Sequence, residues 1–197
     1  MSIQQTYGQR MEQGQKYFHV YCRSRDSSFF LDFFLRFDNK SDREERKKIN
    51  RLAPIWEIFE MFAENCINNY RISEYCTIDE SLVLFQGRCP FRQFMQNKPA
   101  KYGIKVFCLV DSRMFYTSQM EIYAGKQLEG PYKLSNSPAD VVKRLIQPIS
   151  YTGRNVTFDN WFTSVTLAKE ILKGHKITIV GTIRKKQEGN TSRIHQY

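Results

Sequence analysis

The sequence of 197 residues lacks the features that define several common classes of protein. Its five cysteines include no Cys-x-x-Cys pair, and their odd number supports neither a disulfide framework nor a zinc finger. No apolar run is long enough to cross a bilayer, and the polar start has no apolar core of the kind found in a secretory signal. We therefore expect a soluble intracellular protein with reduced thiols and no contact with a membrane.

Patterns for acyl transfer or nucleotide binding are also missing. The three histidines are scattered, without another metal ligand at a suitable spacing, and we assign none of them a chemical role. Residues 125–130 begin and end with glycine but lack the Gly-Lys-Ser/Thr ending of a phosphate-binding loop, so they predict a turn. No grouping of serine, cysteine and histidine for acyl chemistry stands out.

Positive charge is the most marked feature of the composition. The formal net charge is +10, and nine of these ten excess charges fall in residues 76–197. Such an excess favours a polyanionic partner, although lysines that serve only solubility produce the same composition. The hydrophobic content of 41% is ordinary for a globular domain that buries a core.

The first part of the chain predicts helices after a polar arm of residues 1–28. Ser41 or Asp42 fits the cap of a short helix with acidic residues in its first turn. Between residues 53 and 70, apolar side chains recur every three or four positions, and Pro54 suits a first helical turn. This pattern predicts an amphipathic helix that packs against the domain behind it.

From residue 76 onward the pattern changes to short strands separated by turn residues. The predicted elements are strands at 77–85, 103–110 and 115–124, a helix at 138–146, a strand at 155–159, a helix at 164–173 and a strand at 176–183. The order β-β-β-α-β-α-β predicts a mixed α/β fold with a ribonuclease-H-like core, in which the fourth strand inserts beside the first. The ends of these two strands then meet.

Two aspartates, Asp79 and Asp159, lie in the first and fourth predicted strands, eighty positions apart. Paired carboxylates suit a hard cation such as Mg²⁺ or Mn²⁺, and phosphodiester transfer uses two such cations. Each aspartate also has a simpler interpretation, because Asp159 would cap the following helix and Asp79 would pair with a lysine of the neighbouring strand. Strand alternation places Asp79 with Ser81 and Asp159 with Thr157, but it does not assign either face to the core.

A basic segment follows the first strand and leads into the second. Its cations alternate with Phe91, Phe94 and Tyr102, a composition that suits the backbone of DNA and a splayed base. The alternative is a basic hairpin with aromatic side chains packed underneath. The predicted DNA-binding residues are Arg88, Arg92, Lys98, Lys101 and Lys105.

The segments around both aspartates resemble the transposase domain of the piggyBac transposable-element family, from about residue 34 to about residue 186. The stretches that carry the resemblance include Thr77-Ile78-Asp79-Glu80-Ser81, Asn97-Lys98-Pro99-Ala100-Lys101-Tyr102-Gly103 and Val156-Thr157-Phe158-Asp159-Asn160-Trp161. The resemblance implies metal-dependent cleavage and transfer of DNA strands, with Asp79 and Asp159 as catalytic ligands of Mg²⁺ or Mn²⁺. It also implies DNA as a partner and a nuclear location.

Some parts of the family pattern are missing from this sequence. The third catalytic carboxylate of the family lies well beyond the second. We expect the tail of residues 187–197 to depart from the family, and its only acidic residue is Glu188. We also expect this sequence to include neither the final helix of the core nor the cysteine-rich C-terminal module that many family members carry. We thus expect an arm (1–28), a helical segment resembling part of the family's dimerisation and DNA-binding domain (29–75), an incomplete core (76–186) and a tail (187–197).

Three functions are compatible with these observations. The first is a transposase domain fragment, ancestrally able to cleave and transfer DNA but catalytically incomplete as this chain, so that the sequence does not decide whether it is an enzyme. The second is a non-catalytic, domesticated remnant that binds DNA or dimerises, either with itself or with a full-length relative. The third is a degenerate copy that does not fold stably, because apolar sheet surface would be left uncovered.

Overall fold

The computed structural model describes residues 37–127 and 129–183. Apart from residues 37–39, these belong to one compact unit that spans residues 40–197. The expected arm of residues 1–28 and the tail of residues 187–197 lie outside the described residues. Within the described part, no helix is both long enough and apolar enough to cross a membrane.

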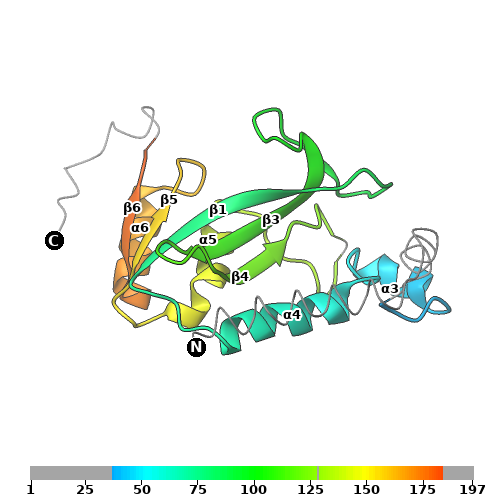
Figure 1. The fold of residues 1–197 in the computed structure, drawn as a ribbon, viewed down its shortest axis with the longest axis horizontal. Helices are drawn as coiled ribbons and strands as arrows, with labels where there is room; N and C mark the ends of the chain where they lie inside the picture. The colour runs from blue at the N-terminus through cyan, green and yellow to red at the C-terminus, as the bar shows by residue number, and fades with distance from the viewer. Residues whose placement is uncertain (1–36, 128, 184–197) are drawn as a thin grey trace, which may run out of the picture. The chain divides into compact units, whose positions relative to one another are not determined.

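Within the described residues, two helices precede the sheet (Figure 1). The first, α3 (Arg43–Ile49), begins after Asp42, whose side chain pairs with Arg46 at 3.0 Å and makes no capping hydrogen bond. The second, α4 (Trp56–Asn68), is the amphipathic helix that the spacing predicts. It packs against the sheet in part through Tyr116, whose hydroxyl donates to the carbonyl oxygen of Cys66 at 3.1 Å.

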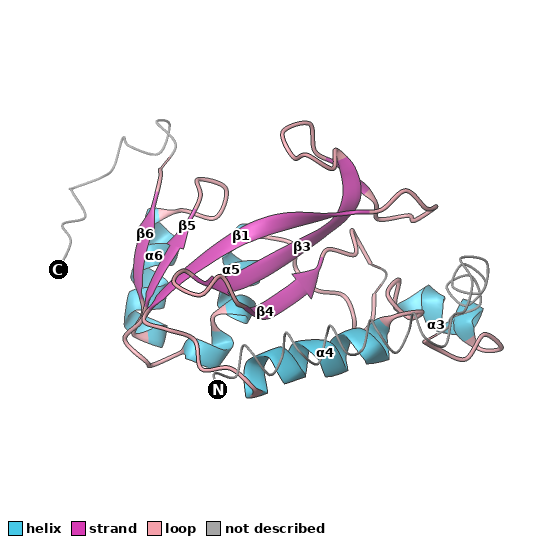
Figure 2. Cartoon of the chain, in the orientation of Figure 1, coloured by secondary structure: helices cyan, strands magenta, loops and turns pink. Residues whose placement is uncertain are grey.

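The sheet has six strands, which Figure 2 shows with the helices around them. In chain order the remaining elements are β1 (Tyr75–Leu84), β2 (Gln93–Phe94), β3 (Tyr102–Asp111), β4 (Thr117–Ile122), α5 (Pro138–Leu145), the 3₁₀ turn η1 (Gln147–Ile149), β5 (Asn155–Phe158), α6 (Val165–His175) and β6 (Thr178–Gly181). The predicted mixed α/β order is confirmed, with the short β2 as an addition. The spatial order is β2-β3-β1-β5-β6, and β4 also pairs with β3.

The strand directions explain how distant segments meet. The pairs β1–β3 and β3–β4 are antiparallel and form the predicted meander, whereas β1–β5 and β5–β6 are parallel. Parallel neighbours require crossover connections, which α5 and α6 provide. The chain therefore returns to the middle of the sheet and places β5 directly beside β1 (Figure 1).

One face of the sheet carries the main core. Alternate residues of β1, β3 and β5 pack with residues of α5 and α6 in this core, as the period of a β-strand requires. Both helices begin at a serine whose hydroxyl accepts a backbone N–H bond, Ser137 for α5 and Ser164 for α6. The residues that fill this core include Ile78, Phe107, Leu109, Val141, Leu145, Val156, Phe158, Phe162, Leu167 and Ile171.

Candidate metal and DNA-binding site

The parallel pairing of β1 and β5 places the two predicted aspartates next to each other. The strands are in register from Tyr75 opposite Asn155 to Ile78 opposite Phe158. Asp79 and Asp159 are the next residues on the two strands, so the register carries them to neighbouring positions at the end of β5. Because Ile78 and Phe158 are buried toward α5 and α6, strand alternation directs both carboxylates to the opposite face, and both residues are exposed.

Asp79 is the first residue of β1 beyond the part that pairs with β5. Its Oδ1 accepts the backbone N–H of Glu80 at 2.7 Å, and its Oδ2 lies 4.0 Å from Lys98 Nζ. Lys98 Nζ also donates to the carbonyl oxygen of Glu80 at 2.8 Å. Glu80 also lies beyond the part of β1 that pairs with β5. Asp79 therefore does have a lysine partner, but this lysine comes from the loop between β2 and β3 and not from a neighbouring strand.

Asp159 shapes the turn that follows β5. Its Oδ1 accepts the backbone N–H of Trp161 at 2.9 Å, and its carbonyl oxygen accepts the hydroxyl of Thr163 at 2.6 Å. The suggestion that Asp159 caps the next helix is wrong, because Ser164 caps α6. Among the residues that the structure describes, no hydrogen bond reaches Oδ2 of Asp79 or Oδ2 of Asp159. Oδ2 of Asp79 faces the ammonium group of Lys98 at 4.0 Å, which a metal ion would have to displace or share.

Lys105 links the carboxylates to the core. Its Nζ lies 4.8 Å from the ring centre of Phe107 and 4.7 Å from that of Trp161, and the two rings stack at 5.7 Å. Burial lowers the pKa of Lys105, while the charges of Glu80, Asp159 and Asp79 act in the opposite direction. A single ammonium group thus interacts with both predicted metal ligands, which supports their proximity.

The structure separates the five predicted DNA-binding cations into two groups. Lys98 and Lys105 lie near the aspartates. Arg88, Arg92 and Lys101 are exposed at the far end of β1 and β3, where Figure 1 shows two loops extending from the sheet. The alternative of packed aromatic side chains holds for Phe91, which is buried against Leu52 and Ala124.

The chemistry of the site fits a hard divalent cation in ligand type. Carboxylate oxygens are the ligands that Mg²⁺ and Mn²⁺ prefer. In residues 37–127 and 129–183, no cluster of three or more histidine, cysteine, aspartate or glutamate side chains is placed to hold a metal ion. Asp79 and Asp159 thus supply two carboxylates, and Glu188, the acidic residue of the expected tail, lies outside the described residues.

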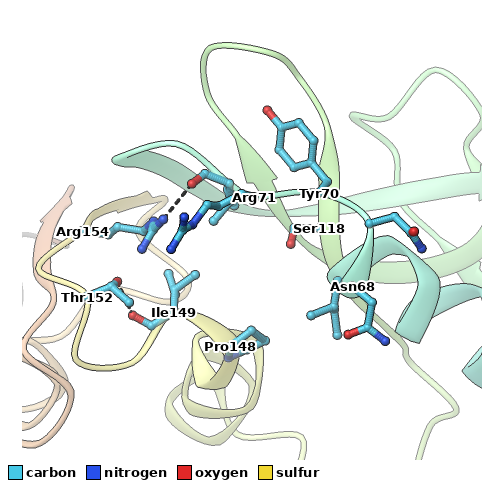
Figure 3. A pocket seen from close by; sticks show the side chains of 11 residues that line it. Asn68, Tyr70, Arg71, Ser118, Pro148, Ile149, Thr152 and Arg154 are labelled. Atoms are coloured by element: carbon cyan, nitrogen blue, oxygen red, sulfur yellow. Dashed lines mark hydrogen bonds between the residues drawn. The ribbon is translucent and has the colours of Figure 1, made fainter. Parts of the chain in front are cut away.

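A cavity of about 570 Å³ lies at the opposite ends of β1 and β5, and Figure 3 shows its lining. Arg71 and Arg154 both line it, and no predicted site residue does. The guanidinium group of Arg154 donates to the carbonyl oxygens of Ser73 and Ile72, each at 2.8 Å. Arg154 therefore fixes the start of β5 against the segment before β1, which sets the register that aligns the two aspartates.

Gly181 on β6 keeps space for the turn after Asp159. It pairs with Phe158, and a Cβ at this position would collide with the hydroxyl of Thr163 and lie 3.0 Å from the carbonyl oxygen of Phe158. We expect Gly181→Ala to lower the free energy of unfolding by about 1–3 kcal/mol, because a backbone carbonyl cannot move aside cheaply. Urea denaturation measures this change.

Gly174 in α6 is the matched control for this substitution. A Cβ there meets nothing within 4 Å. Gly174→Ala is therefore expected to leave stability unchanged or to raise it by about 0.5–1 kcal/mol. Equal effects of the two substitutions would show that the contact with Thr163 does not constrain the turn.

Comparison with known proteins gives consistent results at the levels of family, sequence and structure. The family model described as Transposase IS4 matches residues 29–197, a range that includes the tail we expected to depart from the family. The human PiggyBac transposable element-derived protein 3 is 24% identical over 149 residues, which cover 74% of this chain and 25% of that protein. The human Chimeric ERCC6-PGBD3 protein is also 24% identical over 149 residues, covering 74% of this chain and 14% of that protein.

A solved structure extends the likeness to the fold. It is the cryo-EM structure of a piggyBac transposase synaptic complex with hairpin DNA, which is 38% identical to this chain with a TM-score of 0.78. The likeness covers 90% of this chain and 38% of that one, so the chain spans well under half of the relatives it matches. These matches show that the chain belongs to the piggyBac-type transposase family.

Proposed function

We propose that Asp79 and Asp159 hold a divalent cation and that this domain binds DNA across the sheet face that carries them. The observation that supports this most is the register of β1 and β5, which brings two carboxylates from distant segments to adjacent positions on one face. Mg²⁺ or Mn²⁺ bound there would activate the attacking oxygen and stabilise the leaving oxygen in DNA strand cleavage and transfer. We propose that this activity is ancestral and incomplete in the present chain, because two carboxylates hold such a cation weakly.

The lysines beside the carboxylates have a defined part in this proposal. Lys98 lies 4.0 Å from Asp79 and 3.6 Å from the carboxylate of Glu80, where it offsets negative charge that a metal ion would otherwise balance. Lys105 is fixed by Phe107 and Trp161 and keeps a positive charge close to both aspartates. A DNA phosphate that approaches the carboxylates would meet the ammonium group of Lys98, which reduces the repulsion between anions.

The alternative, a non-catalytic remnant that binds DNA or dimerises, is supported by the net charge of +10. It also agrees with the finding that, within the described ranges, no three or more histidine, cysteine, aspartate or glutamate side chains are placed to hold a metal ion. It includes a homodimer or a heterodimer with a full-length relative. A nuclear location accompanies either version, because the proposed partner is DNA.

A strand-nicking assay on labelled duplex DNA, with Mg²⁺ or Mn²⁺ and with binding recorded in the same samples, tests the proposal. The unaltered chain, Asp79→Asn and Asp159→Asn are compared. We expect binding by all three and little or no nicking. Robust nicking that both substitutions abolish would show a complete active site, and absence of binding would refute the DNA-binding function.

Salt dependence identifies the cations that contact DNA. Removing one contact between a cation and a DNA phosphate reduces the magnitude of the negative slope of log K against log salt concentration by about one. We expect Arg88→Gln and Lys101→Gln each to show this decrease, whereas Lys169→Gln, which removes an exposed charge from α6, leaves the slope unchanged. Equal slopes in all variants would place the DNA elsewhere on the surface.

A further inference from the structure

An exposed aromatic pair lies at the tip of the sheet, beyond the metal site. Phe94 of β2 and Tyr102 of β3 are direct cross-strand partners, and their ring centres lie 4.8 Å apart. Phe94 is 57% exposed and Tyr102 is 50% exposed. Two large rings left half in water at the end of a projecting sheet mark an interaction surface, because burial of such rings is normally favourable.

The aromatic pair shares its sheet face with the proposed metal ligands. Cys108 is the partner of Asp79 on β3, and Tyr102 is six residues before it, so strand alternation places both on one face. Six residues of strand span roughly 20 Å, about the length of six base-pair steps along DNA. Ser81 and Val83, which lie between the two ends on β1, are exposed, so the β1 part of this face is open. On β3, Ile104 of the same face packs against Leu52, Phe91 and Ala124.

The surroundings of the pair are positively charged. Residues 85–102 contain four cations and no acidic residue. The guanidinium group of Arg92 lies 5.3 Å from the ring centre of Tyr102 and also donates to the carbonyl oxygens of Gln86 and Gly87, at 3.1 and 3.3 Å. The pair is thus fixed in position, and its surroundings repel a second copy of this cationic chain while attracting a nucleic acid strand.

We propose that the Phe94–Tyr102 pair binds an unpaired base of the DNA strand whose backbone passes Asp79 and Asp159. An aromatic ring stacks on the face of a base, and in a paired duplex these faces are already covered by neighbouring bases. The pair would therefore favour DNA with an unstacked base over a fully paired duplex. This inference rests on the proposed DNA-binding function and adds a preference for distorted DNA.

The test compares two duplexes of the same sequence, one fully paired and one with a single unpaired 2-aminopurine, each titrated with the full chain. We expect binding to the second duplex to be about tenfold tighter, with quenching of the 2-aminopurine fluorescence. Phe94→Leu and Tyr102→Leu should lose the preference and keep their affinity for the paired duplex. Tyr102→Phe should retain the preference because it keeps the ring.

Phe115→Leu is the matched control, since Phe115 is 83% exposed at a different turn and should have no effect. Equal affinity for the two duplexes, or a preference that survives Phe94→Leu and Tyr102→Leu, would overturn the inference while leaving the proposed function intact. Absence of binding to both duplexes would overturn the proposed function as well. Self-association of the unaltered chain that both leucine variants abolish, measured by sedimentation, would assign the pair to a dimer contact instead.

Discussion

Replacing Phe107 with alanine is expected to lower the free energy of unfolding by about 3–5 kcal/mol, because the substitution leaves a large cavity in the core. The side chain is 1% exposed and packs against Trp161, Phe162 and Tyr123. It also supports Lys105, whose ammonium group lies over its ring. Phe107 therefore joins the core to the charges around the two aspartates.

The second expected effect of Phe107→Ala is local. Trp161 follows Asp159 by two residues and would lose its stacking partner, so its fluorescence should shift to longer wavelength as water reaches the indole ring. Only Trp56 and Trp161 are present, so a Trp56→Phe background reports Trp161 alone. Phe115→Ala, at an exposed position, should change stability by less than about 0.5 kcal/mol. Similar losses in both variants would contradict the packing described for Phe107.

Replacing Asp111 with alanine should be similarly severe, at about 3–5 kcal/mol, because five hydrogen bonds to one buried, charged acceptor would be lost. The Asp111 carboxylate is fully buried and accepts hydrogen bonds from the Tyr70 hydroxyl and from the backbone and hydroxyl of Ser73, at 2.6–3.0 Å. It also accepts the backbone N–H groups of Arg113 and Met114, at 2.8 and 3.1 Å. This one side chain connects the segment before β1 to the turn between β3 and β4.

The same site predicts a pH dependence. Burial alone would raise the pKa of Asp111, but the hydrogen bonds from Ser73, Arg113 and Met114 outweigh it and lower the pKa from 3.8 to about 2. A carboxyl whose pKa is lower in the folded chain stabilises that chain above the unfolded pKa and loses this contribution as pH falls through the folded one. The unaltered chain should therefore lose stability between about pH 4 and pH 2, and Asp111→Asn should show a shallower decline. Parallel curves would contradict this assignment.

Much of the fold follows from local patterns in the sequence. Runs of β-branched and aromatic residues such as those of β1 and β3, separated by turn residues, predict the strands, and the three-to-four-residue spacing of apolar side chains predicts α4. The insertion of β5 beside β1 follows from the element order because parallel strands need a crossover. By contrast, β2 has two residues, Gln93 and Phe94, which is too short for any periodicity to reveal.

The details of the site depend on contacts between distant residues, which no local pattern encodes. Asp79 and Asp159 are recognisable as a pair, but their common face depends on the register of β1 and β5. The contact of Lys105 with Trp161 and the contact of Lys98 with Glu80 depend on how loops fold back onto the sheet. Asp111 is not singled out by the sequence analysis, although an aspartate between a strand and a turn often accepts backbone N–H groups two residues ahead.

Binding of Mn²⁺ to the full chain, measured by calorimetry for the unaltered protein, Asp79→Asn and Asp159→Asn, tests the central claim most directly. Glu57→Gln, which removes an exposed acid from α4, serves as the control. The adjacent carboxylates predict weak binding that each aspartate substitution weakens further by at least about tenfold, because hard cations depend on their oxygen ligands, and that Glu57→Gln leaves unchanged. Binding that survives both aspartate substitutions, or that depends on only one of them, would contradict a shared metal site.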